Sequence, residues 1–357
     1  MTPHPSFSKT LLSWFDDNGR KDLPWQKNKT AYRVWVSEIM LQQTQVSAVI
    51  DYYQRFMSRF PTIQDLANAS IDDVLSHWAG LGYYARARNL HKSAITVCEE
   101  YSGVFPETLT GITALPGIGR STAGAILSIV FKAPHPILDG NVKRVLARLH
   151  NIDGWPGAPA IEKQLWALAD AYTPDKRCAE YTQAIMDFGA TLCTRSKPKC
   201  TACPFNKQCE SLNAGTVARR PNPKPKTAKP TKELWLLDVR NSNDILLEKR
   251  PPSGIWGGLY SLLELDRAYG FEELEEALLS EYKIKAQRLE QQKSFEHVFS
   301  HYKLVAHVVR VDGAIQQGAD NQVHENGQIL WQNSEELDQL GMPAPIKKYF
   351  ARVRELP

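Results

Sequence analysis

Apolar residues in the first half of the chain recur at three- and four-residue steps, the period of a helix with one buried face. The clearest run covers residues 46–60, where the apolar positions are Val46, Val49, Ile50, Tyr53, Phe56, Met57 and Phe60. Residues 142–149 and 165–169 repeat this period. Since strand-type alternation is hard to find from Lys9 to about Ile185, we expect this half to be a helix bundle with short loops.

The pattern changes in the second half, where short apolar runs are bounded by turn residues. Such runs, rich in Leu, Val and Tyr, are typical of strands. They cover residues 233–240, 244–250, 259–265 and 301–311. Residues 271–282 and 346–353 have helical spacing instead. We therefore expect a smaller α+β domain in this half.

Residues 219–232 separate the two patterns and are rich in proline and basic side chains, with no acidic one. Such a segment cannot build a core and is typical of a linker. The sequence therefore predicts a helical domain over residues 1–218, a linker over 219–232, and an α+β domain over 233–357.

Length and composition agree with two folded domains. The chain has 357 residues, of which 43% are hydrophobic and 23% are charged, which excludes a mainly disordered protein. No stretch approaches the ~18 to 20 apolar residues of a membrane helix, and the N-terminus has no apolar signal-peptide core. We expect a cytoplasmic protein.

The charge is divided unevenly between the halves. Residues 1–232 hold 29 Lys and Arg against 19 Asp and Glu, whereas residues 233–357 hold 14 against 20. The first half is therefore suited to a polyanion such as nucleic acid, although uneven solvated surfaces would give the same count.

Four of the six cysteines fall within seventeen residues, in the spacing C-x6-C-x2-C-x5-C. They are Cys193, Cys200, Cys203 and Cys209. Thiols bunched in this way in a reducing compartment indicate a metal site. Zinc sites usually show two separated close pairs, so one close pair flanked by single thiols favours a [4Fe-4S] cluster over zinc. Four protein ligands leave no open position, so we expect the cluster to shape a loop that also carries basic residues.

A glycine hairpin that leads into a helix is predicted by the segment LPGIGRSTAGAIL, which begins at Leu115. Gly117 and Gly119 break the preceding helix, and apolar positions of helical spacing follow Arg120. A helix N-terminus presents unpaired backbone N–H groups, which suits a DNA phosphate. A plain tight turn is the alternative interpretation.

Two carboxylates stand out by their surroundings. Asp139, in PILDGNVKRV, is placed to be the N-cap of the helix that follows, a position for which Asn141 competes. Glu38, in VWVSEIMLQQTQV, has apolar neighbours on both sides. Its carboxyl either reaches solvent or lies in a pocket that raises its pKa, as a general acid requires.

Several of these segments together resemble the MutY family of adenine DNA glycosylases, within the helix-hairpin-helix glycosylase superfamily. The resemblance covers nearly the whole chain and rests on VWVSEIMLQQTQV, GLGYYARARNL, LPGIGRSTAGAI, PILDGNVKRV, the four cysteines, PPSGIWGGLY and FSH. It implies an all-α two-lobed glycosylase domain with an iron-sulfur loop, followed by a Nudix-like domain. It also implies a bacterial enzyme that meets DNA at the nucleoid.

The resemblance implies the substrate and the roles of the carboxylates. The substrate is adenine mispaired with 8-oxoguanine in double-stranded DNA, with adenine opposite guanine as a poorer one. Glu38 is the implied acid, and Asp139 the implied carboxylate beside the sugar. Bifunctional relatives carry a Schiff-base lysine where this chain has Ser121, so we expect a monofunctional enzyme. Lys143 is near enough to Asp139 in sequence to trap an occasional adduct.

Further residues match the positions that hold the damaged base pair. Gln43 and Tyr83 match the wedge residues beside 8-oxoguanine, with Thr44 nearby. Without the resemblance, Gln43 would be taken as a polar helix end and Tyr83 as a core aromatic. In the second half, Ser300 and His301 of FSH are the candidate readers of the lesion.

The second half fails the Nudix hydrolase motif G-x5-E-x7-R-E-U-x-E-E-x-G-U, where U is a bulky apolar residue. With Gly258 and Glu264 at the first two places, Glu272 replaces Arg, Ala277 replaces the second paired Glu, and Leu279 replaces Gly. We therefore expect recognition of the lesion instead of nucleotide hydrolysis.

Three other functions remain open at this point: a bifunctional glycosylase for oxidised pyrimidines, a non-catalytic DNA-binding protein with a structural metal, and a Nudix hydrolase. Ser121 argues against the bifunctional glycosylase, and the two carboxylates argue against a non-catalytic protein. The incomplete Nudix motif argues against a Nudix hydrolase. Because one chain supplies both an excision site and a lesion reader, we expect a monomer on DNA.

Overall fold

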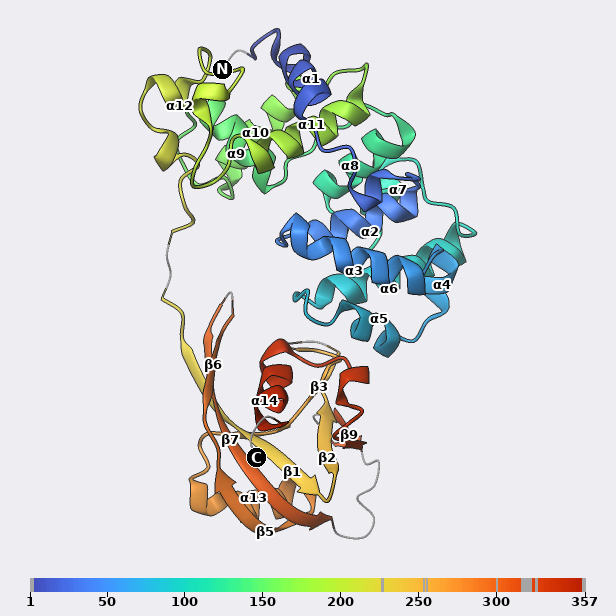
Figure 1. Ribbon diagram of the computed structural model, residues 1–357, viewed down its shortest axis with the longest axis vertical. Helices are drawn as coiled ribbons and strands as arrows, with labels where there is room; N and C mark the ends of the chain where they lie inside the picture. Colours follow the sequence, from blue (N-terminus) through green and yellow to red (C-terminus); the bar gives the residue numbers. More distant parts are fainter. Residues whose placement is uncertain are drawn as a thin grey trace. The chain divides into compact units, whose positions relative to one another are not determined.

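The computed structural model describes residues 3–225, 228–252, 254, 256–299, 301–315, 323–324 and 327–354. The chain forms two compact units (Figure 1). The first comprises residues 1–68 and 89–226, and the second comprises residues 69–88 and 227–357. The segment 69–88 therefore groups with the C-terminal half, a division that differs from the continuous helical domain expected from sequence.

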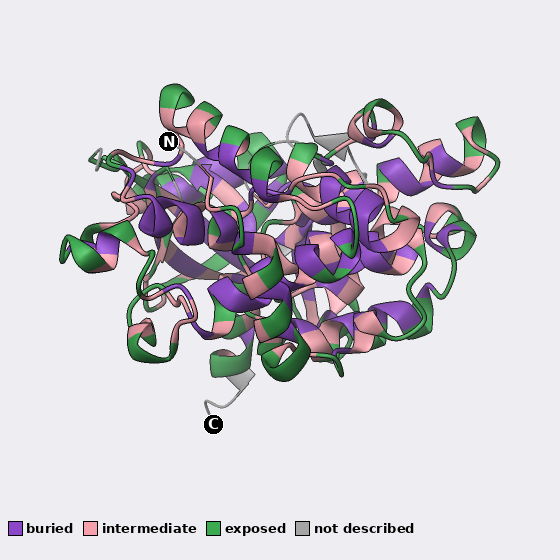
Figure 2. Ribbon diagram, turned by 90° about the horizontal axis from the view of Figure 1, so that it is seen from above, coloured by how far each residue is buried: buried purple, intermediate pink, exposed green. Residues whose placement is uncertain are grey.

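The first unit is helical, as expected. Its longer helices are α1 (Phe7–Asn18), α2 (Ala31–Leu41), α3 (Val46–Arg59), α6 (Ala85–Glu100, shared with the second unit), α8 (Arg120–Phe131), α9 (Gly140–Leu149), α10 (Pro159–Tyr172) and α11 (Cys178–Thr191). Its shorter ones are η1 (Pro24–Gln26), α4 (Ile63–Asn68), α7 (Leu109–Thr113), η2 (Cys200–Ala202), α12 (Glu210–Asn213) and η3 (Val217–Arg219). Buried and exposed stripes run side by side along these helices, as their amphipathic spacing requires (Figure 2).

Local signals explain where several of these helices begin. Thr30 caps α2 by accepting the N–H of Arg33 at 3.2 Å. Thr108 caps α7 in the same way, and α8 follows after the short turn 114–119. These two helices and the turn form the hairpin that the glycine-rich motif predicted.

The second unit is built on one twisted sheet covered by helices. The order of its central strands is β5-β7-β1-β2-β9-β8, with β3 on β2, β4 on β1 and β6 on β7. The strands are β1 (Thr231–Asn241), β2 (Asp244–Lys249), β3 (Tyr260–Ser261), β4 (Leu263–Asp266), β5 (Ile284–Gln291), β6 (Phe295–Val298), β7 (Lys303–Ile315), β8 (Val323–His324) and β9 (Gly327–Asn333). β1 and β7 run parallel, and the other pairs run antiparallel.

Each face of the sheet packs against its own helix. Trp235, Leu237 and Val239 alternate along β1 toward a core that includes α13 (Leu274–Tyr282). The neighbouring position Leu236 joins the opposite core, with α14 (Ala344–Arg354). The unit also contains η4 (Phe271–Glu273), η5 (Leu337–Gln339) and α5 (Ile71–Trp78). This period-two partition is what a sheet covered on both faces requires.

The linker is shorter than the sequence suggested. Arg219 ends η3, and the side chain of Arg220 binds Asn151 and Asp153 of the first unit, at 3.2 Å and 2.9 Å. At the other end, β1 already begins at Thr231.

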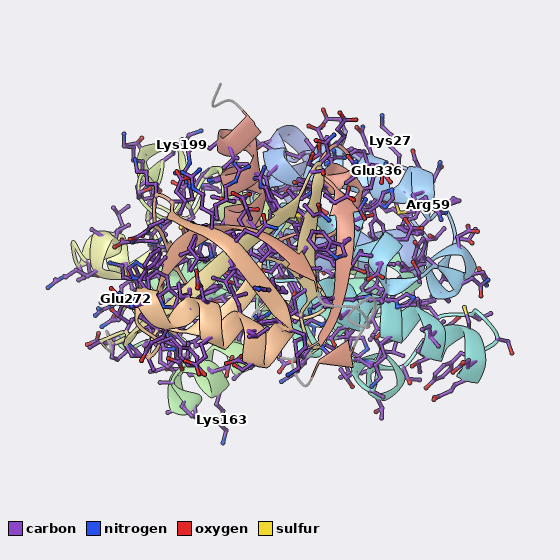
Figure 3. All side chains as sticks on the ribbon, turned by 90° about the horizontal axis from the view of Figure 1, so that it is seen from below. Lys27, Arg59, Lys163, Lys199, Glu272 and Glu336 are labelled. Carbon is purple, nitrogen blue, oxygen red and sulfur yellow. The ribbon has the colours of Figure 1, made fainter. Side chains whose placement is uncertain are left out.

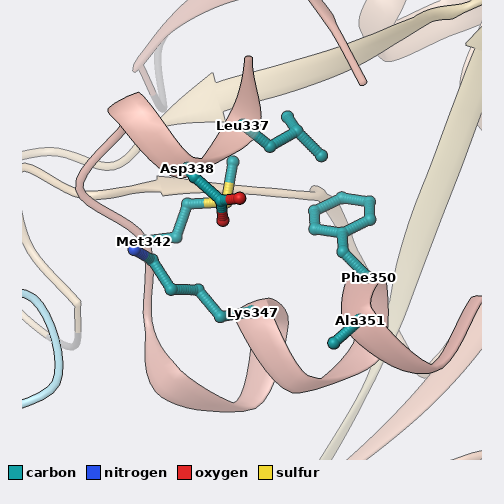
Figure 4. A pocket seen from close by; sticks show the side chains of 6 residues that line it. All are labelled: Leu337, Asp338, Met342, Lys347, Phe350 and Ala351. Atoms are coloured by element: carbon teal, nitrogen blue, oxygen red, sulfur yellow. The ribbon is translucent and has the colours of Figure 1, made fainter. Parts of the chain in front are cut away.

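Two further features bear on what the fold can bind. A hollow of about 40 Å³ between η5 and α14 is lined by Leu337, Asp338, Met342, Lys347, Phe350 and Ala351 (Figure 4). This volume suits a water or two and no nucleotide. Among the described residues, no helix is long and apolar enough to cross a membrane.

Candidate active site

Glu38 lies in the last turns of α2, among the buried residues of that helix. Ser37 and Ile39 on either side are buried, whereas Glu38 itself is partly exposed. Burial of the carboxyl, and then the nearby carboxylate of Asp139, raise the pKa of Glu38 to about 7. A substantial fraction of this carboxyl therefore carries a proton near neutral pH.

Asp139 is the N-cap of α9, as the sequence predicted. Its Oδ1 accepts the N–H of Val142 at 2.8 Å, and its Oδ2 accepts the side-chain amide of Asn141 at 3.3 Å. Burial raises the pKa of Asp139, but the N–H groups of Val142 and Asn141 and the charge of Arg144 oppose that rise. Asn141 therefore supports the carboxylate and does not replace it as the cap.

The surroundings of the two carboxyls act differently on their charged forms. Desolvation acts on both, but hydrogen bonds favour the charged form at Asp139, while the Asp139 charge favours the neutral form at Glu38. In glycosidase sites, two carboxyls take different roles when their environments separate their pKa values.

Ser121 and Lys143 have different positions around this pair. The Ser121 hydroxyl accepts the backbone N–H of Leu138, the residue before Asp139, at 2.9 Å. The ammonium of Lys143 forms an ion pair with Glu162 of α10, with 2.6 Å between nitrogen and oxygen. Ser121 thus positions the segment before Asp139, whereas the side chain of Lys143 is directed to Glu162 of α10.

The hairpin contains a backbone conformation that favours glycine. Gly117 adopts a left-handed φ of 78°, and a Cβ there would lie 2.8 Å from the Cβ of Asn89. A Cβ at Gly119 would meet nothing within 4 Å, so the approach to the start of α8 is open. The side chain of Leu115 is buried, so only its backbone can face DNA. Arg120 lies over Trp166 and pairs with Asp170, 3.2 Å away.

The residues matched to the DNA wedge are exposed and have unusual backbone angles. Gln43 and Tyr83 have left-handed φ values of 57° and 50°, and such strain concentrates at functional positions. Tyr83 is 55% exposed, so the alternative interpretation as a core aromatic is wrong. Thr44 is partly exposed beside Gln43. Gln43 lies in the first unit and Tyr83 in the second.

The cysteine loop is anchored by Arg148, a buried residue of α9. Its guanidinium donates to the carbonyls of Thr194 and Arg195, at 2.7 Å and 2.9 Å, and lies 3.5 Å from the sulfur of Cys193. Burial, and then the neighbouring thiols, raise the pKa of Cys203 to about 12. Around the loop the basic side chains are exposed, and Lys199 is labelled in Figure 3.

Arg144 connects this loop to Asp139 through Asn141, a connection that the sequence had not indicated. It donates to the carbonyl of Cys193 at 2.9 Å and to the side-chain oxygen of Asn141 at 2.8 Å. Asn141 in turn donates to Asp139. The local signal in the sequence is the four-residue spacing of Arg144 and Arg148, which places both on one face of α9 but does not identify their partners.

In the second unit, two of the motifs quoted above meet. Arg88 of GLGYYARARNL donates to the carbonyl of Gly257 in PPSGIWGGLY at 2.7 Å. Tyr84 donates to the carbonyl of Met342 at 3.2 Å, and Lys249 pairs with Asp72 at 2.7 Å. These bonds attach the segment that carries Tyr83 to the Nudix-like sheet.

The candidate lesion reader is only partly described. Ser300 lies outside the described residues, and His301 is exposed just before β7. The two residues flanking this tip are joined, since the N–H of Phe299 donates to the carbonyl of Tyr302 at 2.9 Å.

At the positions of the Nudix motif, several side chains that the hydrolase motif requires are replaced. Glu264 is paired with Arg250. Glu272 is exposed where an arginine belongs (Figure 3), and Ala277 is buried in the core without a carboxylate.

Comparison with known proteins agrees with both units. Residues 36–171 match the HhH-GPD superfamily of base excision DNA repair proteins, and residues 234–352 match the NUDIX domain. The adenine DNA glycosylase of Buchnera aphidicola from Acyrthosiphon pisum is 41% identical, over 98% of both chains. The human adenine DNA glycosylase is 34% identical, over 97% of this chain and 73% of its own. A thermostable thymine-DNA glycosylase superposes with a TM-score of 0.52 at 27% identity, over 58% of this chain and 95% of its own.

The fold and the site thus define a base excision repair glycosylase of the helix-hairpin-helix class, with a C-terminal Nudix-like domain. It acts on DNA and hydrolyses N-glycosyl bonds. Within that class, the chain belongs to the adenine DNA glycosylases.

Proposed function

We propose that this enzyme removes adenine mispaired with 8-oxoguanine, and less efficiently adenine opposite guanine, by hydrolysis at Glu38 and Asp139. The observation that carries the proposal is the pair itself: a partly buried Glu38 whose pKa is about 7, beside an Asp139 held by three hydrogen-bonding or charged neighbours. An acid must be protonated and a cation stabiliser ionised at the same pH. The raised pKa of Glu38 serves the first requirement, and the hydrogen bonds and positive charge at Asp139 oppose the rise that burial gives its pKa.

In the proposed reaction, Glu38 donates its proton to N7 of adenine, which becomes a better leaving group. The bond between C1′ and N9 breaks, and its electrons leave with the base. The Asp139 carboxylate stabilises the positive charge that develops on the sugar. Water then adds its oxygen to C1′ and gives up a proton, which leaves an abasic site.

Ser121 supports a monofunctional reaction. A hydroxyl cannot form the imine that a lysine forms with the sugar, and the Ser121 oxygen already accepts a hydrogen bond from Leu138. The side-chain nitrogen of Lys143 is held in an ion pair with Glu162 of α10. The enzyme therefore leaves the DNA strand intact.

The target base must leave the duplex before it can react. We assign Gln43 and Tyr83 to the space beside the partner base, with Thr44 close to it, because Gln43 and Tyr83 are exposed on strained backbone. The hairpin from Leu115 to Arg120 binds the phosphate backbone through the N–H groups of Gly117, Gly119 and the first turn of α8. Ser300 and His301 form hydrogen bonds with the 8-oxoguanine.

A [4Fe-4S] cluster is the proposed cofactor, held by Cys193, Cys200, Cys203 and Cys209. Four thiolates around a single zinc ion lie about 3.8 Å apart, given Zn–S bonds of about 2.3 Å. Among the described residues, no three of these sulfurs lie within 4.8 Å of one another, which fits the larger cluster better. The bound cluster holds the loop closed and supplies positive charge that keeps the thiolates deprotonated.

The test is a set of labelled duplexes with adenine opposite 8-oxoguanine, guanine or thymine. We expect adenine release in the first, slower release in the second and none in the third. The strand should break only after hot alkali. Release opposite thymine at an equal rate would contradict the proposed substrate, and strand breaks without alkali would contradict the monofunctional reaction.

A further inference from the structure

Three side chains outside the catalytic site meet at the edge of the first unit. His4 precedes α1, His150 ends α9, and Glu210 begins α12 directly after Cys209. One ligand atom from each lies within 4.8 Å of the other two. Within the described part of the chain, these are the three residues of metal-ligand type that converge so closely.

The two imidazoles leave nitrogens with unused bonding capacity. His150 is 1% exposed, and its Nδ1 is buried without a hydrogen-bond partner. The Nε2 of His4 is also buried without one. The Oε1 of Glu210 lies 3.7 Å from Nδ1 of His150. Buried nitrogens of this kind normally have hydrogen-bond partners, so the lack of a partner at these two requires an explanation.

Tyr172 fixes the orientation of both histidine residues. Its hydroxyl lies 2.7 Å from Nε2 of His150 and accepts the backbone N–H of His4 at 3.0 Å. If Nε2 of His150 donates to this oxygen, the lone pair of Nδ1 points away from Tyr172 and remains available. Histidine ligands of metal ions are oriented in this way, with the second ring nitrogen donating to an oxygen.

We propose that His4, His150 and Glu210 bind a zinc-type divalent transition metal ion through two imidazole nitrogens and one carboxylate, with water at the fourth position. Two imidazoles and a carboxylate are a donor set that zinc accepts in proteins. Ligand atoms around such an ion lie about 3.3 Å apart, so the 3.7 Å between His150 and Glu210 needs only a small contraction.

A plain ring stack explains these observations less well. His4 and His150 do stack, with ring centroids 5.2 Å apart. Stacking alone leaves Nδ1 of His150 and Nε2 of His4 without partners, whereas a metal ion binds both nitrogens and brings Glu210 into the same site.

The proposed ion would join three separate parts of the first unit. It would attach the N-terminal segment to the last residue of the cysteine loop and to the C-terminal end of α9, whose first turn is capped by Asp139. The expected consequence is greater stability of the folded unit when the ion is bound. The catalytic groups are elsewhere, so excision needs no such ion.

The experiment uses the full-length protein with its iron content measured, freed of other metals and dialysed against Zn²⁺ or Mg²⁺. We expect one zinc ion per chain, no magnesium and no loss of iron. X-ray absorption at the zinc edge should show nitrogen and oxygen ligands at about 2.0 to 2.1 Å and no sulfur at about 2.3 Å. Zinc should also raise the melting temperature.

Substitutions then locate the site. His4→Ala and Glu210→Gln should each weaken zinc binding at least tenfold and remove the rise in melting temperature, while His135→Ala and Glu107→Gln should leave both unchanged. His4→Ala is a safe variant, because the bond from His4 to Tyr172 uses the backbone and survives. A wild-type protein that binds no zinc, a sulfur shell around the zinc, or unchanged binding in both test variants would overturn the proposal.

Discussion

The hydroxyl of Ser121 accepts the backbone N–H of Leu138 at 2.9 Å, which ties the first turn of the hairpin helix to the residue before Asp139. The side chain of Ser121 therefore has a structural role in this chain. Ser121→Ala should slow adenine excision by about fivefold to tenfold, the value of one hydrogen bond, because the Asp139 segment loses a constraint. Single-turnover excision measures the effect.

Thr113→Ala is the matched control, since its hydroxyl bonds only within α7, to Leu109 and Thr110. It should react at the wild-type rate. An equal loss of rate in both variants would mean that loss of a helix hydroxyl, and not the position of Asp139, is responsible.

Excision should depend on pH through Glu38. Because burial and Asp139 raise the pKa of Glu38 to about 7, the proton donor is present below that pH and lost above it. The single-turnover rate should therefore fall about tenfold per pH unit above 7, with DNA kept saturating. A rate that stays flat from pH 7 to pH 9 would show that Glu38 is not the acid.

The two roles of Asp139 can be separated by two substitutions. Asparagine caps helices as well as aspartate does, whereas alanine loses the bond to Val142. Asp139→Asn should keep the stability of the wild type and lose most of its activity. Asp139→Ala should lose activity and also about 0.5 to 2 kcal/mol of unfolding free energy. Denaturant unfolding and excision assays on the same samples test this, and a fully active Asp139→Asn would contradict the electrostatic role.

Glu248, in β2 of the second unit, should make stability depend on pH. It is 1% exposed, neither carboxyl oxygen has a hydrogen-bond partner, and burial raises its pKa to about 7. Because folding raises the pKa of this acid, its contribution to the free energy of unfolding is fully present below about pH 4.5. That contribution is lost as the pH rises through 7, by up to about 3 kcal/mol. Glu248→Gln should therefore be stabilising relative to wild type, and more so at pH 8 than at pH 5.

The exposed Glu335→Gln is the control for that comparison and should show no such trend. If the difference between Glu248→Gln and wild type were the same at pH 5 and pH 8, the Glu248 carboxyl would not be titrating in the folded state within this range.

Lesion recognition should be lost with the FSH tip. Replacing Ser300 and His301 by Ala in the full-length chain should reduce the preference for 8-oxoguanine over guanine by roughly tenfold to a hundredfold, at about 1 to 3 kcal/mol per good base contact. Excision opposite guanine should change little. Unchanged preference would assign lesion reading to Gln43, Thr44 and Tyr83.

Sequence alone predicted the parts of this molecule that local patterns determine. The helices of the first unit have one apolar face, Asp139 precedes α9 as a cap, and the strands β1, β2 and β7 have strongly apolar sequences. β5 was missed because most of its residues, from Ile284 to Gln291, are polar and exposed, so no alternation identifies it. The run 259–265 proved to be two short strands, β3 and β4.

Contacts between distant segments were beyond local patterns. Nothing near Arg88 indicates that it donates to the carbonyl of Gly257, 169 residues later, nor does the sequence around Arg144 name Cys193 as its partner. Such contacts depend on how the helices pack. The sequence therefore singled out Glu38 and Asp139 as candidate catalytic carboxylates, but not the hydrogen bonds that hold Asp139.

The measurement that tests the account most directly is adenine release from an A:8-oxoguanine duplex by wild type and by Glu38→Gln, with Glu99→Gln as an exposed control. We expect wild type and Glu99→Gln to release adenine, while Glu38→Gln binds the duplex within about tenfold of wild type and releases none. Normal turnover by Glu38→Gln would contradict the proposed mechanism.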